Sequence, residues 1–327
     1  MCEEKQESAS AEGRRYLSVE IGGTKQQIAV GTASGQILER RCAKLGDQTT
    51  AAGILAWIKA TVDDICSGAD FSGIGVGFGG PIDPVSGRII CSLQVEGWKN
   101  FSLRGWFEDT FHLPTVVLND TVTGGVAEWK LGAGMGCRRL FYTNIGTGIG
   151  GGLYDRGGYG ASSLGYTWLP DWRSTEPGTG TRLEFLCAGP WIESRLRQPG
   201  YVPADSVLAG RSAPLTCSDL AEGGRTGDPF CMAELDRVAS SFAMGLTNVL
   251  ALAAPDRLVV GGGVAKMGEV FFSRLRRFTS EFAFVGTISN YQLLPSALMD
   301  DAVLAGALLL SGDPALARDG TAWHQSI

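Results

Sequence analysis

The chain has 327 residues, 44% of them hydrophobic, and a formal net charge of −6, as expected for a soluble globular protein with room for two cores. The acidic balance and the lack of a dense Lys/Arg run argue against nucleic acid and acidic membranes as partners. The sequence has no apolar leader and no run of about 18 apolar residues, so we expect a cytoplasmic protein without a membrane span. The eight cysteines form no C-x-C or C-x-x-C pair, which predicts reduced, mostly buried thiols and no zinc site.

The N-terminal part predicts a polar, disordered tail over residues 1–15, followed by a hairpin of two strands, Tyr16–Ile21 and Gln26–Thr32. The link between the strands contains two glycines, whose backbone N–H groups are not covered by side chains and could bind an anionic phosphate. An ordinary Gly-Gly hairpin would explain the same residues equally well. The link consists of Gly22, Gly23, Thr24 and Lys25. Glu20, just before the link, is a candidate ligand for Mg²⁺, which prefers carboxylates beside substrate phosphates.

A third strand over 36–44, a helix over 50–66 and a buried strand over 73–77 are predicted next. Gly79-Gly80-Pro81 then forms a loop whose bare backbone allows a ligand to come close. Trp98 is predicted to lie in the core, ahead of a helix over 103–111.

The stretch Pro114–Glu128 is central to the functional prediction. Its β-branched, apolar run over 115–118 predicts a buried strand, and helix-forming residues follow. Asn119 and Asp120 come where the strand ends, which is where open α/β sheets bind ligands. Asp120 is expected to cap the helix and to act as a catalytic base, although Asn-Asp before a helix is often only a cap.

The second half repeats the start of the first. A strand over 140–145 ends in Ile145-Gly146, which matches Ile21-Gly22 and indicates an internal duplication. The glycine cluster that follows satisfies G-x-G-x-x-G, but a hairpin strand rather than a helix is expected after it, so we reject a dinucleotide site. Residues 160–180 are expected to form an irregular loop.

Helices are then predicted over 182–196, 229–253, 267–282 and 300–310, and short strands over 257–260 and 291–294. The triplet Gly261-Gly262-Gly263 follows one of these strands. A flat purine could lie against its bare backbone, and a simple strand-to-helix turn would explain the triplet equally well.

Taken together, five motifs resemble those of the ROK sugar kinases, which belong to the actin-like ATPase superfamily with hexokinase. They are IGGTK at 21–25, GFGGPID at 77–83, LND at 118–120, IGTGIGGG at 145–152 and VVGGGVA at 259–265. The resemblance implies an α/β protein with the two-lobed actin-like (ribonuclease H-like) fold, each lobe a mixed sheet flanked by helices. It places the N-terminal lobe at 16–119, completed by a helix at 300–312, the nucleotide-binding lobe at 120–299, and a tail at 313–327.

The resemblance also implies a set of site residues, with ATP and Mg²⁺ as cofactors. It assigns ATP contacts to Gly22, Gly23, Thr24, Lys25, Gly146, Thr147, Gly148, Gly261, Gly262 and Gly263. It makes Asp120 the base that takes the proton of the attacking hydroxyl. Sugar contacts fall on Gly80, Asn119, Ser163, Tyr166 and Glu184.

The chain departs from the family pattern at three places. Glu20 stands where the family usually has Asp. Ser163-Leu164-Gly165-Tyr166 replaces a Glu-x-Gly-His motif whose two ends bind sugar hydroxyls, and the zinc motif that normally follows is missing. The transfer machinery therefore matches the family, whereas the sugar pocket differs.

We hypothesise from these residues an ATP-dependent kinase for a hydroxyl of a sugar or sugar derivative other than plain glucose. The alternatives are a kinase for a non-sugar alcohol and a catalytically degenerate ROK-fold protein that senses a ligand or regulates a partner. A DNA-binding repressor is disfavoured, because no helix-turn-helix precedes the first strand. The sequence leaves a homodimer open.

Overall fold

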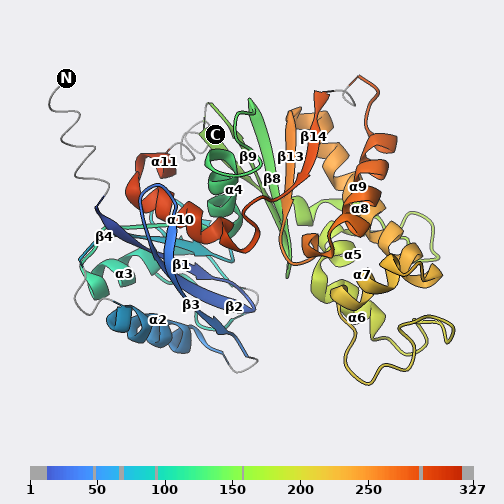
Figure 1. Cartoon of the computed structure of the whole chain (residues 1–327), viewed down its shortest axis with the longest axis horizontal. Coiled ribbons are helices and arrows are strands. Elements are labelled where there is room, and N and C mark those ends of the chain that lie inside the picture. The colour runs from blue at the N-terminus through green and yellow to red at the C-terminus, as the bar shows by residue number, and fades with distance from the viewer. Residues whose placement is uncertain are drawn as a thin grey trace. The chain divides into compact units, whose positions relative to one another are not determined.

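The computed structural model describes residues 13–46, 49–65, 70–92, 95–156, 158–286 and 290–318. The chain divides into two compact units, coloured along the sequence in Figure 1. The first unit takes the chain up to Met135, the segment Tyr154–Gly160 and the chain from Asp300 onward, and the second takes Gly136–Leu153 and Ala161–Met299. Residues 120–135 thus belong to the first unit, whereas the sequence analysis began the second lobe at 120.

The first unit is built on a five-stranded mixed sheet with the order β3-β2-β1-β4-β7. The strands are β1 (Arg15–Ile21), β2 (Lys25–Gly31), β3 (Ile37–Lys44), β4 (Phe71–Phe78) and β7 (Thr115–Asn119). The three strands β1, β2 and β3 pair antiparallel, while β4 pairs parallel with both β1 and β7. Strands β1, β2 and β4 are buried along almost their whole length, so helices must cover both faces.

One face of this sheet is covered by α2 (Ala51–Ile65) and α3 (Leu103–Phe111), whose apolar side chains share a core with the strands. Buried Trp98 lies in this core, as predicted. The other face is covered by α4 (Asp120–Lys130) and α10 (Ala302–Gly312) (Figure 1). Helix α10 packs very closely against β4 and α4. A β-carbon on Gly75 of β4 would overlap the Ala307 backbone, and one on Gly306 of α10 would overlap Thr123 of α4. The closing helix α10 therefore belongs to the first unit's core.

The second five-stranded sheet, most of which lies in the second unit, has the order β10-β9-β8-β13-β14, which repeats the order of the first sheet. Its strands are β8 (Arg139–Ile145), β9 (Ile149–Asp155), β10 (Gly158–Ser162), β13 (Arg257–Gly261) and β14 (Gln292–Pro295). β13 pairs parallel with both β8 and β14, just as β4 does with its two neighbours. The shared order supports the internal duplication inferred from the glycine motifs.

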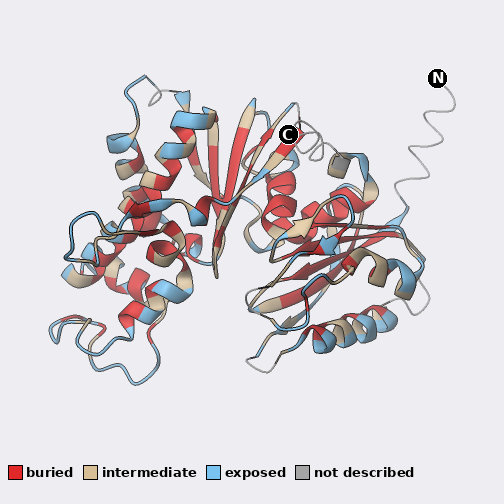
Figure 2. Ribbon diagram, turned by 180° about the vertical axis from the view of Figure 1, so that it is seen from behind, coloured by how far each residue is buried: buried red, intermediate tan, exposed pale blue. Residues whose placement is uncertain are grey.

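The second core is formed mainly by five helices: α5 (Leu183–Cys187), α6 (Gly189–Leu196), α7 (Cys217–Arg225), α8 (Pro229–Ala253) and α9 (Glu269–Phe282). Figure 2 shows buried residues concentrated along the strands and on the helix faces that cover them. No helix in the described part of the chain is long and apolar enough to cross a membrane.

Three expectations about elements need correction. The single helix predicted over 182–196 is two helices, because Ala188 is extended (φ −71°, ψ 148°) and Pro190 stands in the first turn of α6. The loop expected over 160–180 contains a small ribbon of β11 (Trp168–Pro170) and β12 (Gly180–Arg182). The C-terminal tail includes a short helix, α11 (Ala315–Arg318), whereas most of the N-terminal tail lies outside the described residues.

The cysteines described by the structure are free thiols, and two of them, Cys187 and Cys231, are buried. Cys42 is exposed, so the expectation of mostly buried thiols holds for only part of the set.

Candidate active site

Asn119 and Asp120 stand where β7 passes into α4, and their roles differ from those predicted. Asn119 is the N-cap, since its Oδ1 accepts from Thr121 N at 3.0 Å and Val122 N at 3.3 Å. Asp120 is the first residue of the helix. The expectation that Asp120 caps the helix is therefore wrong, because the residue before it already supplies the acceptor. This leaves the Asp120 carboxylate available for other contacts.

The amide of Asn119 also holds the neighbouring glycine loop. Its Nδ2 donates to Phe78 O at 3.3 Å and to Gly80 O at 3.1 Å, both at the end of β4. All the polar atoms of this side chain are thus engaged inside the first unit. Asn119 fixes the Gly79-Gly80 loop beside the end of β7.

The Asp120 carboxylate lies against this loop and against the β1–β2 turn. A β-carbon on Gly79 would lie 3.2 Å from Asp120 Oδ2 and 3.3 Å from Gly22 Cα, so only glycine lets the three segments meet without a shift. Asp120 Oδ1 accepts from Thr121 N at 2.7 Å and from Thr121 Oγ1 at 3.3 Å. Oδ2 accepts no hydrogen bond from the described residues, so it is the oxygen that could contact a ligand.

The surroundings of Asp120 disfavour its charged form. Burial, together with the nearby charge of Glu20, raises the pKa of Asp120 to about 7, while the hydrogen bonds from Thr121 oppose the shift. A carboxyl group with a pKa near neutrality can accept a proton from a substrate and later release it to water. The position therefore has the properties of a general base.

Glu20, at the end of β1, is buried and lies near the same point. Its Oε2 accepts from Gln27 Nε2 at 2.6 Å and lies 3.9 Å from Lys25 Nζ, which is 3.7 Å from Asp300 Oδ1. Burial raises the pKa of Glu20, although Lys25 opposes the shift. A divalent cation would relieve the repulsion between Glu20 and Asp120, which makes Glu20 a candidate Mg²⁺ ligand. The described residues contain no cluster of three or more His, Cys, Asp or Glu side chains that could hold a metal, so the remaining ligands would have to be phosphate oxygens and water.

The β1–β2 turn has the bare backbone predicted for a phosphate loop. Gly22 N donates to Lys25 O at 3.1 Å, and Thr24 O accepts from Leu45 N at 2.9 Å. The amides of Gly23 and Thr24 make no hydrogen bond to any described residue. Two adjacent backbone donors are therefore left for an anion.

In the second unit, the turn between β8 and β9 is held by Glu184. Glu184 Oε2 accepts from Ile149 N at 3.1 Å, and a β-carbon on Gly148 would come within 2.7 Å of the same oxygen. Gly146 N bonds to Gly148 O at 2.9 Å, which closes the turn around Thr147. Glu184 was predicted as a sugar ligand, and within this unit it contacts the turn between β8 and β9, which was predicted to bind phosphate.

Ser163 and Tyr166 flank a short 3₁₀ turn, Leu164–Tyr166, that packs on the same glutamate. A β-carbon on Gly165 would lie 3.3 Å from Glu184 Cβ. The half-exposed ring of Tyr166 is covered by the Arg182 guanidinium, 4.4 Å from the ring centroid. Sequence reasoning missed Arg182, whose only signal was its position two residues before Glu184.

The two glycine motifs of the second unit meet beside Asn144. A β-carbon on Gly262, whose φ is +95°, would overlap Asn144 Oδ1, and one on Gly146 would lie 3.9 Å from Gly263 N. Asn144 Oδ1 is buried and has no hydrogen-bond partner in the described part of the chain. The turns at 146–148 and 261–263 thus form one patch of bare backbone, which neither motif could show alone.

Substitutions at Gly262 and Gly263 should separate structural from binding effects. We expect Gly262→Ala to lower the free energy of unfolding by about 1–3 kcal/mol. The new methyl group would overlap Asn144, and the positive φ at this position is unfavourable for alanine. Gly263→Ala meets no atom within 4 Å, so it should leave stability within about 0.5 kcal/mol yet weaken ATP binding at least about fivefold. Urea denaturation and titration with an ATP analogue measure the two effects. Unchanged ATP affinity in Gly263→Ala would remove this turn from the nucleotide site.

Both sheets have the same strand order, and in each a glycine-rich turn follows the first strand. This arrangement defines the actin-like class of phosphotransferase folds. In this chain a carboxylate, Asp120, follows the end of β7. The model of the ROK family matches residues 16–313, so the chain belongs to the ROK family. It is 26% identical over 305 residues to a glucokinase of Thermotoga maritima, covering 90% of this chain and 96% of that one.

Two solved structures show how far the fold is shared. A ROK family glucokinase from Streptomyces griseus, in complex with glucose and AMPPNP, superposes with a TM-score of 0.76 at 26% identity, covering 91% of this chain and 99% of that chain. A ROK family transcriptional regulator, a homologue of the E. coli MLC protein, gives a TM-score of 0.80 at 19% identity, covering 94% and 80%. The regulator shares the fold alone.

Proposed function

We propose that this ROK protein is an ATP-dependent kinase that phosphorylates a hydroxyl of a sugar or sugar derivative. The observation that carries the proposal is the Asp120 carboxylate, which has a pKa of about 7 and lies beside the two glycine turns of the first unit. The similarity over nearly the whole chain to glucokinases, one of them crystallised with glucose and AMPPNP, supports the substrate class.

In the proposed reaction, Asp120 Oδ2 accepts a hydrogen bond from the sugar hydroxyl and orients it toward the γ-phosphate. The hydroxyl oxygen forms a bond to the γ-phosphorus, the bond from phosphorus to the β–γ bridging oxygen breaks, and ADP leaves. The hydroxyl proton passes to Asp120. Because this proton is lost late in such transfers, positioning is the main contribution of the carboxylate.

The glycine turns supply the remaining groups. The free amides of Gly23 and Thr24 would hold phosphate oxygens, and the bare patch formed by 146–148 and 261–263 would take the rest of the nucleotide. Mg²⁺, when bound beside Glu20, would neutralise charge on the transferred phosphate.

The acceptor is proposed to be a sugar other than plain glucose. Gly80 of the first unit and Ser163, Tyr166 and Glu184 of the second are the proposed contacts. Asn119 was predicted as a further contact, but its polar atoms all bond within the first unit, so its proposed role is to hold the Gly80 loop. Arg182, stacked on Tyr166, adds a cation to the proposed contacts. A coupled assay of ADP release over hexoses, amino sugars, sugar acids and polyols identifies the acceptor. Tight ATP binding without accelerated transfer to any acceptor would favour the ligand-sensing alternative.

The catalytic rate should depend on pH through Asp120. The base must be ionised, and its pKa is raised to about 7, so we expect kcat/KM to rise about tenfold per pH unit below pH 7 and to level off above it. Glu20→Gln should move the midpoint to lower pH, because it removes a negative charge that disfavours ionisation of Asp120. Initial rates between pH 5.5 and 8.5 at constant ionic strength measure both. A profile that stays flat across this range contradicts the assignment.

A further inference from the structure

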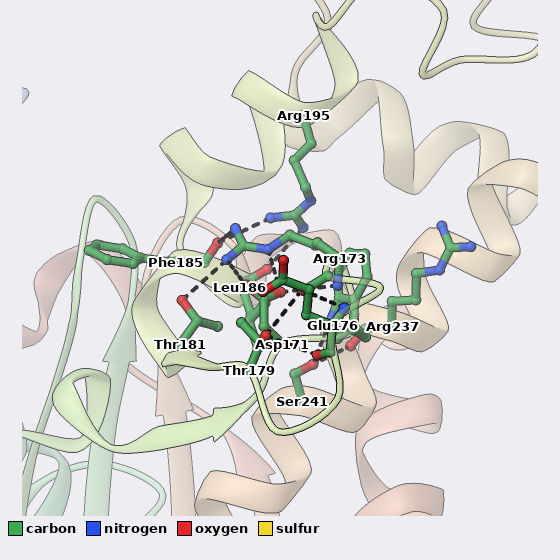
Figure 3. A network of polar contacts seen from close by, with 12 residues as sticks. Asp171, Arg173, Glu176, Thr179, Thr181, Phe185, Leu186, Arg195, Arg237 and Ser241 are labelled. Atoms are coloured by element: carbon green, nitrogen blue, oxygen red, sulfur yellow. Dashed lines mark hydrogen bonds and ion pairs between the residues drawn. The ribbon is translucent and has the colours of Figure 1, made fainter.

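A cavity of about 550 Å³ in the second unit is lined by none of the residues discussed above. Its wall carries three guanidinium groups, from Arg173, Arg195 and Arg237, and three aromatic rings, from Trp172, Trp191 and Tyr201. Figure 3 shows the three arginines coming from separate elements, namely the loop after β11, helix α6 and helix α8. Sites for small molecules typically fill about 300–1,000 Å³, so the cavity is of suitable size.

The charges around this cavity do not balance. Among the described residues, two carboxylates form ion pairs with the three arginines, and neither carboxylate is among the lining residues. Asp171 pairs with Arg173 at 2.7 Å through both of its oxygens. Glu234, which is fully buried, is shared between Arg195 at 2.9 Å and Arg237 at 3.4 Å. The wall therefore carries a net positive charge toward solvent.

The three arginines differ in how far their donors are used. Arg195 gives four hydrogen bonds, two to Glu234 and one each to the carbonyls of Phe185 and Leu186, so it serves the fold. Arg237 gives one, the 3.4 Å contact, and no other hydrogen bond within the described residues. An arginine has five N–H donors, which leaves four on Arg237 for a ligand. Arg173, bonded to Asp171, Phe185 O and Thr181, retains one.

The unused donors of Arg237 are held in place before any ligand arrives. The Trp172 ring lies 5.4 Å from the Arg237 guanidinium and 5.3 Å from that of Arg195. Trp172 is itself fixed, because its Nε1 donates to Ser241 Oγ at 3.1 Å. A guanidinium held by an aromatic ring and a carboxylate loses little freedom on binding an anion, and its planar fork matches phosphate oxygens.

We propose that this cavity binds a small phosphate monoester. Arg237 and Arg173 take the phosphate, and the Trp191 ring, 41% exposed, takes the organic part. Phosphate fits the site better than a carboxylate, because its three terminal oxygens can meet donors from two arginines at once. The proposal concerns binding alone and does not depend on phosphoryl transfer.

Calorimetry on the full chain, with AMPPNP present to occupy the nucleotide site, tests the proposal. The probes are inorganic phosphate, glucose 6-phosphate and neutral glucose, with ionic strength held by sodium chloride. We expect saturable binding of glucose 6-phosphate, accompanied by a change in tryptophan fluorescence. Inorganic phosphate binding equally tightly would mean that the free anion is the ligand, which still supports the phosphate site. Absence of saturable binding by both phosphate compounds overturns the proposal.

Matched arginine variants place the binding. Arg237→Gln should weaken it at least about tenfold, because a charged hydrogen-bond donor is lost, while Glu234 keeps its bonds to Arg195 and Tyr201. Arg277→Gln is the control, since Arg277 on α9 is 51% exposed, close to the 47% of Arg237, and also pairs with a carboxylate. It should change affinity less than about twofold. Arg237→Lys keeps the charge without the fork and should weaken binding at least about threefold. Affinity unchanged in Arg237→Gln, Arg237→Lys and Arg173→Gln contradicts the proposed site.

Discussion

Replacement of Asp120 by asparagine is expected to lower kcat for phosphoryl transfer by about 10²–10⁴-fold while leaving ATP affinity within about twofold. The amide keeps the shape of the carboxylate but cannot take the hydroxyl proton. ADP release at pH 8, with single-turnover rates on the preferred sugar, measures the loss. Asp63→Asn removes the same charge from a side chain on the exposed face of α2 and should leave kcat unchanged. Turnover within tenfold of the unmodified protein would rule out Asp120 as the base.

The same variant should be more stable than the parent at high pH, which shows that its lost activity is not misfolding. The folded-state pKa of about 7 lies above the ordinary value of 3.8, so ionisation of Asp120 opposes folding. At pH 8 asparagine removes this cost, of the order of 2–4 kcal/mol after allowance for solvent screening. The gain should shrink as the pH falls below 7 and disappear below the unfolded-state pKa of 3.8, where the carboxyl group is protonated in both states. Urea unfolding at pH 5 and pH 8 measures the difference.

Replacement of Glu234 by glutamine is expected to reduce the free energy of unfolding by about 3–5 kcal/mol. Glu234 is fully buried on α8 and accepts from Arg195 at 2.9 Å and from Tyr201 Oη at 2.7 Å. Loss of its charge leaves the buried Arg195 guanidinium without a counter-ion. Urea denaturation followed by far-UV circular dichroism measures the change.

The control for this substitution is Glu222→Gln on the surface of α7. Glu222 also pairs with an arginine, Arg225 at 2.8 Å, but its side chain is 60% exposed. Solvent screens such a pair, so the change should stay below about 0.5 kcal/mol. Equal effects of the two substitutions would show that the Arg195–Glu234 pair adds no more to stability than a surface ion pair.

Elements with a strong apolar pattern were predicted well. The helices over 103–111 and 229–253 have the predicted bounds, because each combines an amphipathic period with clear end signals such as Asp228 and Pro229. The break at Ala188 was not predicted, although Gly189-Pro190 inside the predicted helix was a local signal for it. It is stabilised from outside the helix, where Gly189 N donates to Gly146 O at 2.8 Å.

The sequence placed Asp120 on the elements where the structure has it, between β7 and α4, but it gave no information on the electrostatics of this residue. Asp120 was found because a carboxylate follows a buried strand, which is a local pattern. The influence of Glu20 on its pKa depends on the strand order β1-β4-β7, which brings together residues far apart in the sequence. The engagement of Asn119 with Gly80 is likewise a contact across the sheet.

The order of the motifs, the spacing of apolar residues and the placing of glycines can all be read along the chain. The sequence by itself therefore determined the family, the internal duplication and the place of Asp120 at the end of a strand. The pKa of that acid, the meeting of the turns at 146–148 and 261–263, and the arginine-lined cavity required the tertiary structure. Burial and the field of distant charges act through space, and only folding brings Glu20 toward Asp120 or places Arg237 beside Trp172.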